Sequence, residues 1–106
     1  MEYKTHKDNL PFVGGSLAGY VDTTYRKLVQ LFGKPMAGDG YKTDAEWEVQ
    51  FEDGLRCDIY NYKDGKNYNG AKGTAKTKIT DWHIGSHHDE PERSAVVQRI
   101  RDMCRE

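Results

Sequence analysis

Alternating apolar and polar residues in the middle of the chain predict an antiparallel β-hairpin. Every second residue of 44–52 is apolar, as in a strand with one buried face, and the same alternation runs through 55–59. Asp53 and Gly54 lie between the two runs. An Asp-Gly pair is typical of a type I′ turn, in which both residues have a positive φ.

A spacing of three to four residues between apolar side chains predicts two helices. The first begins at Asp22, whose carboxylate can accept a free backbone N–H of the first turn, and ends at Gly33. The second begins near Asp89, with Pro91 in its first turn and Glu92 at the capping-box position. Each helix has an apolar stripe: Tyr25, Leu28, Val29 and Phe32 in the first, and Val96, Ile100, Met103 and Cys104 in the second.

A third strand is expected from Lys76 to Ile84. The predicted fold class is α+β: a three-stranded antiparallel meander flanked by an N-terminal and a C-terminal helix (αβββα), in a single domain of residues 1–106. Residues 1–21, which include a run of small residues, are expected to form an irregular or short extended lead-in. Both helices are expected on the sheet face that carries Trp47, while the opposite face stays wet or meets a partner.

Composition indicates a folded chain with a small core. Of the 106 residues, 36% are hydrophobic and 31% charged, so we expect a weak homo-oligomer in which subunits share apolar surface. The aromatic fraction of 11% argues against disorder. No apolar run has the length of a signal sequence or a membrane span, so no membrane partner is expected. The two cysteines lack the spacing of a metal site and are expected as free thiols in a reducing cytoplasm.

The net charge of -1 conceals a polarised distribution of charges. Residues 39–58 hold seven acids and two bases, whereas residues 62–78 hold five lysines and one aspartate. General binders of duplex DNA usually have a strongly basic domain, so duplex DNA is not expected as a partner. The basic segment favours a small anionic ligand.

Aromatic residues flank this basic segment, and together they predict a nucleotide-type ligand. Rings can stack on a base, lysine and arginine can meet phosphate, and amides can read base edges. The candidate ligand-binding residues are Arg56, Tyr60, Asn61, Tyr62, Tyr68, Lys76, Lys78, Trp82 and His83. The alternative is a mobile loop whose lysines only keep it soluble. The segment is longer than ordinary hairpin loops and has Tyr68 in its middle, which favours the functional interpretation.

Three histidines that lie close in sequence raise the question of a metal site. His83, His87 and His88 would straddle a strand end and a loop, without a second ligand cluster elsewhere, so neither a metal nor a cofactor is expected. His83 beside Asp81 could instead act as a general acid or base. No nucleophile has a diagnostic spacing, and we expect a protein that is not an enzyme.

Several short segments carry a resemblance to a known family: Phe32-Gly33-Lys34-Pro35, Asp39-Gly40-Tyr41-Lys42, Glu46-Trp47, Phe51-Glu52-Asp53-Gly54, Ile59-Tyr60-Asn61-Tyr62-Lys63 and Trp82-His83-Ile84-Gly85. Over residues 16–85 the chain resembles small accessory proteins of tailed bacteriophages and prophages. The resemblance implies a protein that acts in the cytoplasm of a bacterial host, where small phage proteins often counter host immunity. It implies no catalytic residue.

Three functions follow as hypotheses. The first is a phage anti-defence protein that binds and sequesters a nucleotide-type immune signal, either a cyclic nucleotide or an ADP-ribose derivative. The second is a protein-binding inhibitor of a host defence complex, similar to an anti-CRISPR protein, whose acidic face mimics nucleic acid. That face would consist of Asp44, Glu46, Glu48 and Glu52. The third is a hydrolase of such signals that depends on His83.

Overall fold

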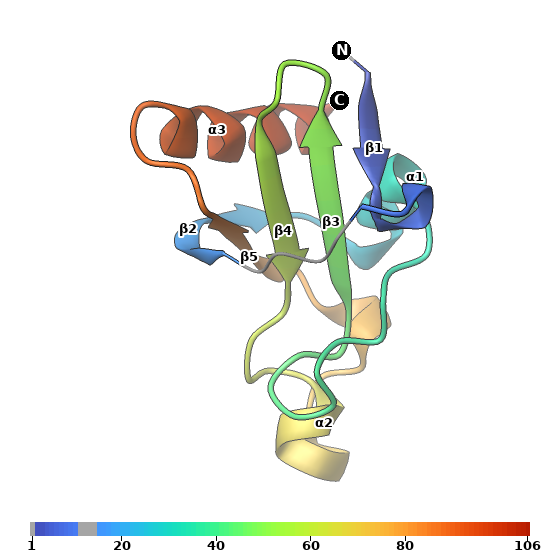
Figure 1. Cartoon of the computed structure of the whole chain (residues 1–106). Coiled ribbons are helices and arrows are strands. Elements are labelled where there is room, and N and C mark those ends of the chain that lie inside the picture. Colours follow the sequence, from blue (N-terminus) through green and yellow to red (C-terminus); the bar gives the residue numbers. More distant parts are fainter. Residues whose placement is uncertain (1, 11–14) are drawn as a thin grey trace.

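A computed structural model, which describes residues 2–10 and 15–106, has a five-stranded antiparallel sheet in the order β1-β3-β4-β5-β2 (Figure 1). The strands are β1 (Tyr3–Thr5), β2 (Ser16–Asp22), β3 (Glu46–Phe51), β4 (Arg56–Tyr60) and β5 (Asp81–Ser86). The α-helices are α1 (Tyr25–Phe32), α2 (Lys66–Asn69) and α3 (Glu92–Arg105), and the 3-10 helices are η1 (His6–Asp8), η2 (Gly70–Lys72) and η3 (Lys76–Lys78). The α+β class is confirmed, whereas the three-stranded meander is wrong.

Two of the five strands come from the segment that was expected to be an irregular lead-in. β1 pairs with β3, and Tyr3 lies opposite Phe51. β2 pairs with β5, so β1 and β2 form the two edges of the sheet. Both segments are strands of the sheet and not an irregular lead-in, while positions 1 and 11–14 lie outside the described residues.

Small residues in β2 permit close packing of a helix. A side chain at Gly19 would place its Cβ 2.8 Å from Cγ1 of Val97 on α3. The strand also has an irregular register between Leu17 and Gly19, as at a β-bulge. The small residues of this strand are typical of a loop. They occur here because α3 approaches the strand backbone closely and leaves no room for larger side chains.

Arginines of α3 cover the free edge of β2. Arg101 Nε donates to the carbonyl of Tyr20 at 2.8 Å, and Arg93 donates to the carbonyls of Ser16 and Leu17. An edge strand with open carbonyls can pair with another chain. These side chains occupy the carbonyls and so disfavour such pairing at β2.

The hairpin of β3 and β4 is confirmed, but its turn is not type I′. Gly54 N–H donates to the carbonyl of Phe51 at 2.9 Å, and Phe51 N–H donates to the carbonyl of Leu55 at 2.8 Å. Within the turn only Gly54 has a positive φ, at 93°. The connection is a type I turn followed by a left-handed glycine, which an Asp-Gly pair suits equally well.

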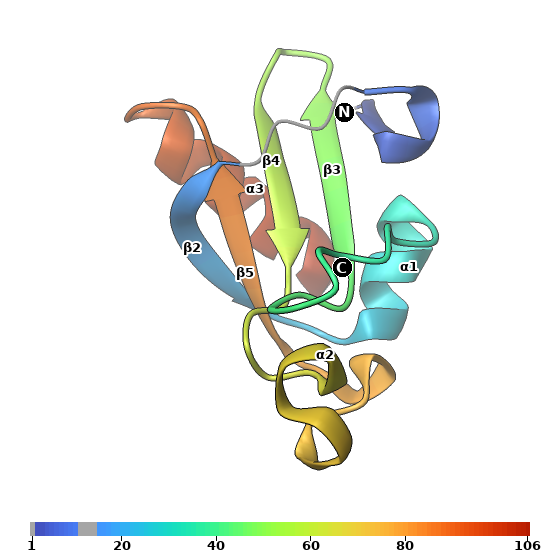
Figure 2. The ribbon, with the colours of Figure 1, turned by 60° about the horizontal axis from the view of Figure 1, so that its bottom comes forward.

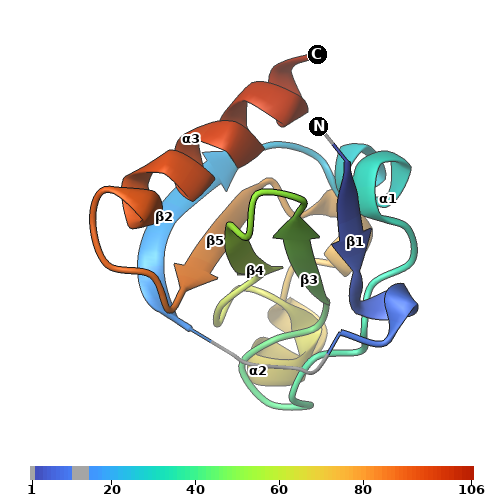
Figure 3. The same ribbon diagram turned by 45° about the horizontal axis from the view of Figure 1, so that its top comes forward.

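One face of the sheet is apolar and is covered by α1 and α3, as expected for the face that carries Trp47 (Figure 3). The core side chains of the sheet are Val21, Trp47, Val49, Phe51, Cys57, Ile59, Trp82 and Ile84, and those of the two helices are Leu28, Phe32, Val96, Val97 and Ile100. Burial of these side chains is the main favourable contribution to folding.

The helix starts differ from the prediction. Thr24 caps α1, with its hydroxyl accepting the N–H of Lys27 at 3.0 Å, because Asp22 belongs to β2. α3 has no side-chain cap at its N-cap residue, and Glu90 instead accepts the N–H of Ser94 at 2.7 Å. The predicted capping box of α3 is therefore wrong.

The opposite face of the sheet, which was expected to stay wet or to meet a partner, is partly buried within the protein itself. Glu48 on β3 and Asp58 on β4 lie directly opposite each other and are only 1% and 6% exposed. Arg56 forms an ion pair with Glu48 at 2.9 Å. The accessible part of this face lies nearer the end of β4, where Tyr60 is half-buried and Tyr62 is exposed.

The long connection between β4 and β5 is folded into α2, η2 and η3, which lie at one end of the sheet (Figure 2). The third strand was expected to start at Lys76, but β5 starts at Asp81 because the preceding segment forms η3. Gly65 and Gly73 are packed so closely that a Cβ on either would collide with a neighbouring atom, at 2.0 Å and 2.3 Å respectively. The segment is a compact excursion from the sheet.

Candidate functional site: an aromatic–lysine surface

Three strands bring aromatic side chains together on the polar face of the sheet. In the strand register, Tyr60 on β4 lies opposite His83 on β5, which lies opposite Tyr20 on β2. The centroid of the His83 ring is 4.8 Å from that of Tyr20 and 5.5 Å from that of Tyr60. Tyr62, just beyond β4, also has its ring centroid 5.5 Å from His83. His83 is therefore surrounded by tyrosine rings.

Asp39 shapes a loop that brings Tyr41 and Lys42 next to this group. Its Oδ1 accepts the backbone N–H groups of Tyr41 at 2.8 Å, Lys42 at 2.9 Å and Thr43 at 3.0 Å. The bond from Tyr41 is the largest cause of a lowered pKa of Asp39. Hydrogen bonds to the charged carboxylate favour its ionised form, which in turn holds the loop.

Asn61, which is fully buried, holds the start of a second loop, the one that follows β4. Its Oδ1 accepts the N–H groups of Asp44 at 2.7 Å and Ala45 at 3.1 Å. Its Nδ2 donates to the carboxylates of Asp44 at 2.9 Å and Asp64 at 3.0 Å. The amide thus satisfies groups of both loops, and Asn67 adds a bond from its N–H to Asp44 at 3.1 Å.

A direct backbone bond joins the two loops. Lys63 N–H donates to the carbonyl of Lys42 at 2.8 Å, so the two lysines lie side by side. Lys63 has a φ of 62°, a left-handed conformation that is uncommon for a residue with a Cβ. The surrounding contacts hold this conformation, and it sets the direction of the chain between Tyr62 and α2.

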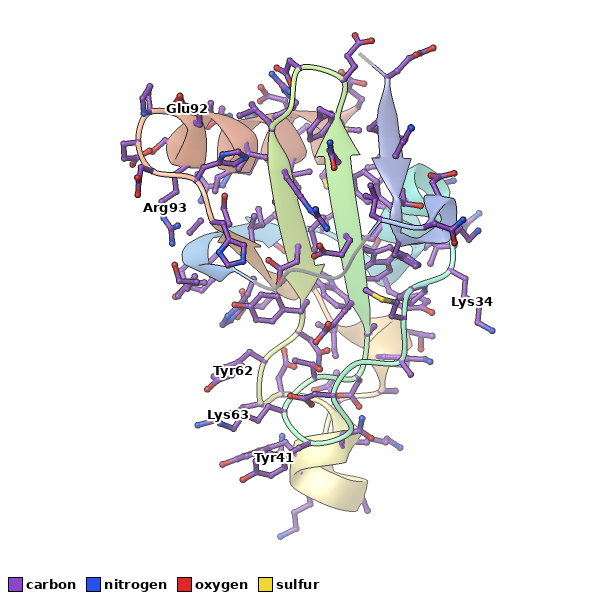
Figure 4. All side chains as sticks on the ribbon, in the orientation of Figure 1. Lys34, Tyr41, Tyr62, Lys63, Glu92 and Arg93 are labelled. Atoms are coloured by element: carbon purple, nitrogen blue, oxygen red, sulfur yellow. The ribbon has the colours of Figure 1, made fainter. Side chains whose placement is uncertain are left out.

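We call the resulting patch the aromatic–lysine surface. Its residues are Tyr20, Tyr41, Lys42, Tyr62, Lys63, Tyr68 and His83. All four of its tyrosines are exposed, with exposed fractions of 48% at Tyr20, 58% at Tyr41, 39% at Tyr62 and 40% at Tyr68. Tyr41, Tyr62 and Lys63 project toward the same side of the molecule in Figure 4.

The two lysines lie against the exposed rings. Lys42 Nζ is 5.9 Å and Lys63 Nζ 5.2 Å from the centroid of the Tyr62 ring. Within residues 2–10 and 15–106, neither ammonium group forms a salt bridge with a carboxylate. Their positive charge is therefore available to an anion that approaches the rings.

The structure brings together part of the predicted ligand-binding set. Tyr62, Tyr68 and His83 belong to the aromatic–lysine surface. Tyr60 lies half-buried behind them, and burial, followed by the negative charge of Asp58, raises the pKa of its phenol. These four positions remain candidates for contact with a ligand.

Two predicted residues are buried and serve the fold. Asn61 is 0% exposed and is used by the loop contacts described above. Trp82 is also 0% exposed, packs against Trp47 at a centroid distance of 5.4 Å, and donates from Nε1 to the carbonyl of Thr23. Neither side chain presents an accessible atom in this structure, so the structure gives no support to their assignment to ligand contact, which stays a prediction.

The predicted cations lie elsewhere. Arg56 pairs with Glu48 at the opposite end of β4 from Tyr60. Lys76 and Lys78 belong to η3, which packs against α1. Among the described residues, no cation–π contact joins Lys76 or Lys78 to a ring of the aromatic–lysine surface.

The prediction missed Tyr20, Tyr41, Lys42 and Lys63. A signal for three of them is present in the sequence, since the Tyr41-Lys42 and Tyr62-Lys63 pairs repeat the same ring and cation shortly before β3 and after β4. In an antiparallel pair, the start of one strand and the end of the next meet at one end of the sheet. Tyr20 had no such signal, because its strand was not expected.

A second polar group, the carboxyl pair of Glu48 and Asp58, is buried on the polar face of the sheet. Burial, and secondly the negative charge of Glu48, raise the pKa of Asp58 to about 6, although a hydrogen bond from Gly15 N–H opposes this. A cavity of about 340 Å³ adjoins the pair, lined by Arg56, Asp58, Ser86 and His88 among others. Arg56 N–H donates to His88 Nε2 at 2.9 Å, so this imidazole supports the backbone.

The acidic residues proposed as a nucleic-acid mimic do not form one continuous exposed surface. Glu48 is buried against Arg56. Asp44 accepts hydrogen bonds from Asn61 and Asn67. Glu46 is half-buried, and burial raises the pKa of its carboxyl.

Among the described residues, no group of three or more histidine, cysteine, aspartate or glutamate side chains has an arrangement that could hold a metal ion. In the same part of the chain, no helix has both the length and the apolar character needed to cross a membrane. Buried Cys57 has a thiol whose pKa burial raises far above the ordinary value.

Comparison with known proteins gives no relative from which a function could be transferred. No protein-family model matches the chain, and no curated protein or solved structure is significantly similar to it. The proposals below therefore depend on the chemistry of the aromatic–lysine surface.

Proposed function

We propose that the protein binds a nucleotide-type anion on the aromatic–lysine surface. In the phage setting that the sequence resemblance implies, this would sequester an immune signal of that chemistry in the cytoplasm of a bacterial host. The observation that most supports the proposal is the crowding of two lysines at one exposed ring, that of Tyr62. A base can stack on the ring while its phosphate meets the ammonium groups.

The mechanism is binding without turnover. His83 has three tyrosine rings as neighbours, which suits a supporting role for the imidazole behind Tyr62. Removing phosphate from water costs free energy, and two cations at fixed positions offset part of that cost. The proposal also retains a homo-oligomer, in which the ligand would be held across the interface between two subunits.

The test uses the purified full chain and isothermal titration calorimetry with adenine and guanine mononucleotides, cyclic dinucleotides and ADP-ribose. We expect at least one of these compounds to bind and to be recovered intact after heat denaturation of the complex. The double substitution Lys42→Ala and Lys63→Ala should weaken binding at least tenfold. Lys34→Ala is the matched control, because Lys34 projects from the other side of the molecule (Figure 4).

Three results would contradict the proposal or redirect it. If none of the compounds binds, the proposed function is wrong. Binding that is equal in the double variant and in wild type would place the ligand away from the aromatic–lysine surface. A converted product in the denatured sample, absent with His83→Ala, would establish the hydrolase instead.

A further inference from the structure

The rings of the aromatic–lysine surface form two separate groups. The first contains Tyr62, the His83 ring beside it, and the Tyr20 ring on His83. The second contains Tyr41 and Tyr68, whose ring centroids are 5.4 Å apart. The first group lies at the ends of β2, β4 and β5, and the second on the two loops joined by the backbone bond at Lys63.

Each lysine of the surface lies between the two groups. Lys42 Nζ is 5.6 Å from the Tyr41 ring and 5.9 Å from the Tyr62 ring. Lys63 Nζ is 5.2 Å from the Tyr62 ring and 5.5 Å from the Tyr68 ring. The arrangement across the surface is thus ring, cation, ring.

We propose that the ligand is a free dinucleotide, in which two bases are joined through a phosphodiester. This inference rests on the proposed function and specifies its ligand. One base stacks on the Tyr62 group, the other on the Tyr41 and Tyr68 pair, and the phosphodiester lies at Lys42 and Lys63. A mononucleotide can occupy only one ring group, whereas each additional stacked base contributes about 1 to 3 kcal/mol.

The spacing of the two groups is fixed by the fold. Lys42 and Lys63 are joined through their backbones, and Asp39 and Asn61 hold the loops on either side. A surface that is ordered before binding loses less entropy when the ligand arrives. It should therefore discriminate by the distance between two bases, in addition to total charge.

Exposed carboxylates favour a free dinucleotide over a longer single strand. Asp22 and Asp81 lie opposite each other on β2 and β5. Each is two residues from Tyr20 or His83 along its strand, and therefore on the same face of the sheet. A phosphate backbone that continued past the first ring group would meet these negative charges. The chain also has a pI of about 6.4, in contrast to strongly basic nucleic-acid binders.

The test compares ligands that differ only in the number of bases, using the full chain and calorimetry. The series is adenosine monophosphate, the linear dinucleotide of two adenosines, cyclic di-adenosine monophosphate, and an eight-nucleotide oligoadenylate. We expect the linear or the cyclic dinucleotide to bind about 5- to 150-fold more tightly than the monophosphate, the effect of one extra stacked base. The oligoadenylate should bind no more tightly per site.

The second ring group provides the decisive variant. Tyr41→Ala combined with Tyr68→Ala should remove the advantage of the dinucleotide, so that the dinucleotide and the monophosphate bind the variant with about equal affinity. Both side chains are well exposed, and circular dichroism melting verifies folding. If the double variant melts early, Tyr41→Ala alone, at the more exposed of the two rings, serves the same purpose.

The outcomes separate this inference from the proposed function. Equal affinity for the monophosphate and both dinucleotides would overturn the two-base ligand but leave nucleotide binding intact. Absence of binding by every compound, including those with guanine bases, would overturn both. Much tighter binding of the oligoadenylate than of either dinucleotide would identify a strand of single-stranded nucleic acid as the occupant and so refute a free dinucleotide.

Discussion

The substitution Asp58→Asn should stabilise the protein at neutral pH, because the native fold raises the pKa of this carboxyl. The raised value of about 6, against an ordinary 3.8, means that the folded state holds a proton more tightly than the unfolded state. Asp58 therefore favours folding below its ordinary pKa, and this contribution is lost as the pH rises through about 6. At about 1.4 kcal/mol per pH unit, the difference corresponds to at most about 3 kcal/mol.

The structure explains why asparagine can replace this aspartate. Glu48 lies directly opposite on β3, so removing one of two facing negative charges relieves their repulsion. Asparagine keeps an oxygen that can accept the N–H of Gly15. Because the variant has no ionisable group here, its stability relative to wild type should increase between about pH 4 and pH 6.5 and then level off, with a gain of about 1 to 3 kcal/mol.

The assay is urea denaturation, followed by circular dichroism, at pH 4.5, 6 and 7.5. Glu52→Gln is the control, because Glu52 is an exposed carboxyl in the neighbouring turn. A gain for Asp58→Asn that is the same at all three pH values would show that packing, and not ionisation, is responsible. A loss of stability that grows with pH would refute the reasoning about burial and the facing carboxylate.

Three further substitutions test other parts of the structure. Asn61→Ala should lower the free energy of unfolding by about 2 to 4 kcal/mol in urea denaturation, because buried N–H groups of Asp44 and Ala45 lose their acceptor; no change would mean that the amide does not hold the loops. Gly19→Ala should cost about 1 to 3 kcal/mol by crowding α3, and a neutral effect would show that the helix can move away. His83→Phe should keep nucleotide affinity within about threefold of wild type, a difference of under 1 kcal/mol, since a ring still supports Tyr62. A loss of nucleotide affinity in calorimetry would show that the imidazole of His83 contacts the ligand directly.

Local patterns predicted those parts of the fold that depend on local forces. The β3–β4 hairpin and the apolar stripe of α1 follow from periods of two and of about 3.6. β2 was missed because its small residues are typical of a loop. A small residue is needed at Gly19 because Val97 on α3 approaches it closely, and this contact joins parts of the chain that are distant in sequence. β1, with three residues, is too short for its period to be distinctive.

The residues of the candidate site were likewise only partly predicted from the sequence. Tyr62, Tyr68 and His83 could be found because they lie in or beside one unusual segment. Lys42 was missed although the Tyr41-Lys42 and Tyr62-Lys63 pairs repeat in the sequence, because its place beside Lys63 depends on a backbone bond across the sheet end. Composition also favoured Lys76 and Lys78 over Lys63, although only Lys63 lies against the rings. Lysine content indicates an anion, but the backbone decides which lysines meet it.

The folded connection between β4 and β5 is longer than a hairpin requires, and the proposed function would give a reason for its length. Two antiparallel neighbours can be joined by a turn of two residues, which fixes fewer backbone dihedrals than this longer segment. Here Asn61, Asn67 and Asn69 are used to order the segment through hydrogen bonds to backbone and carboxylate groups. The ordered segment nevertheless leaves Tyr62 and Tyr68 exposed. Ordering a loop in order to leave its rings in water makes physical sense when those rings await a ligand.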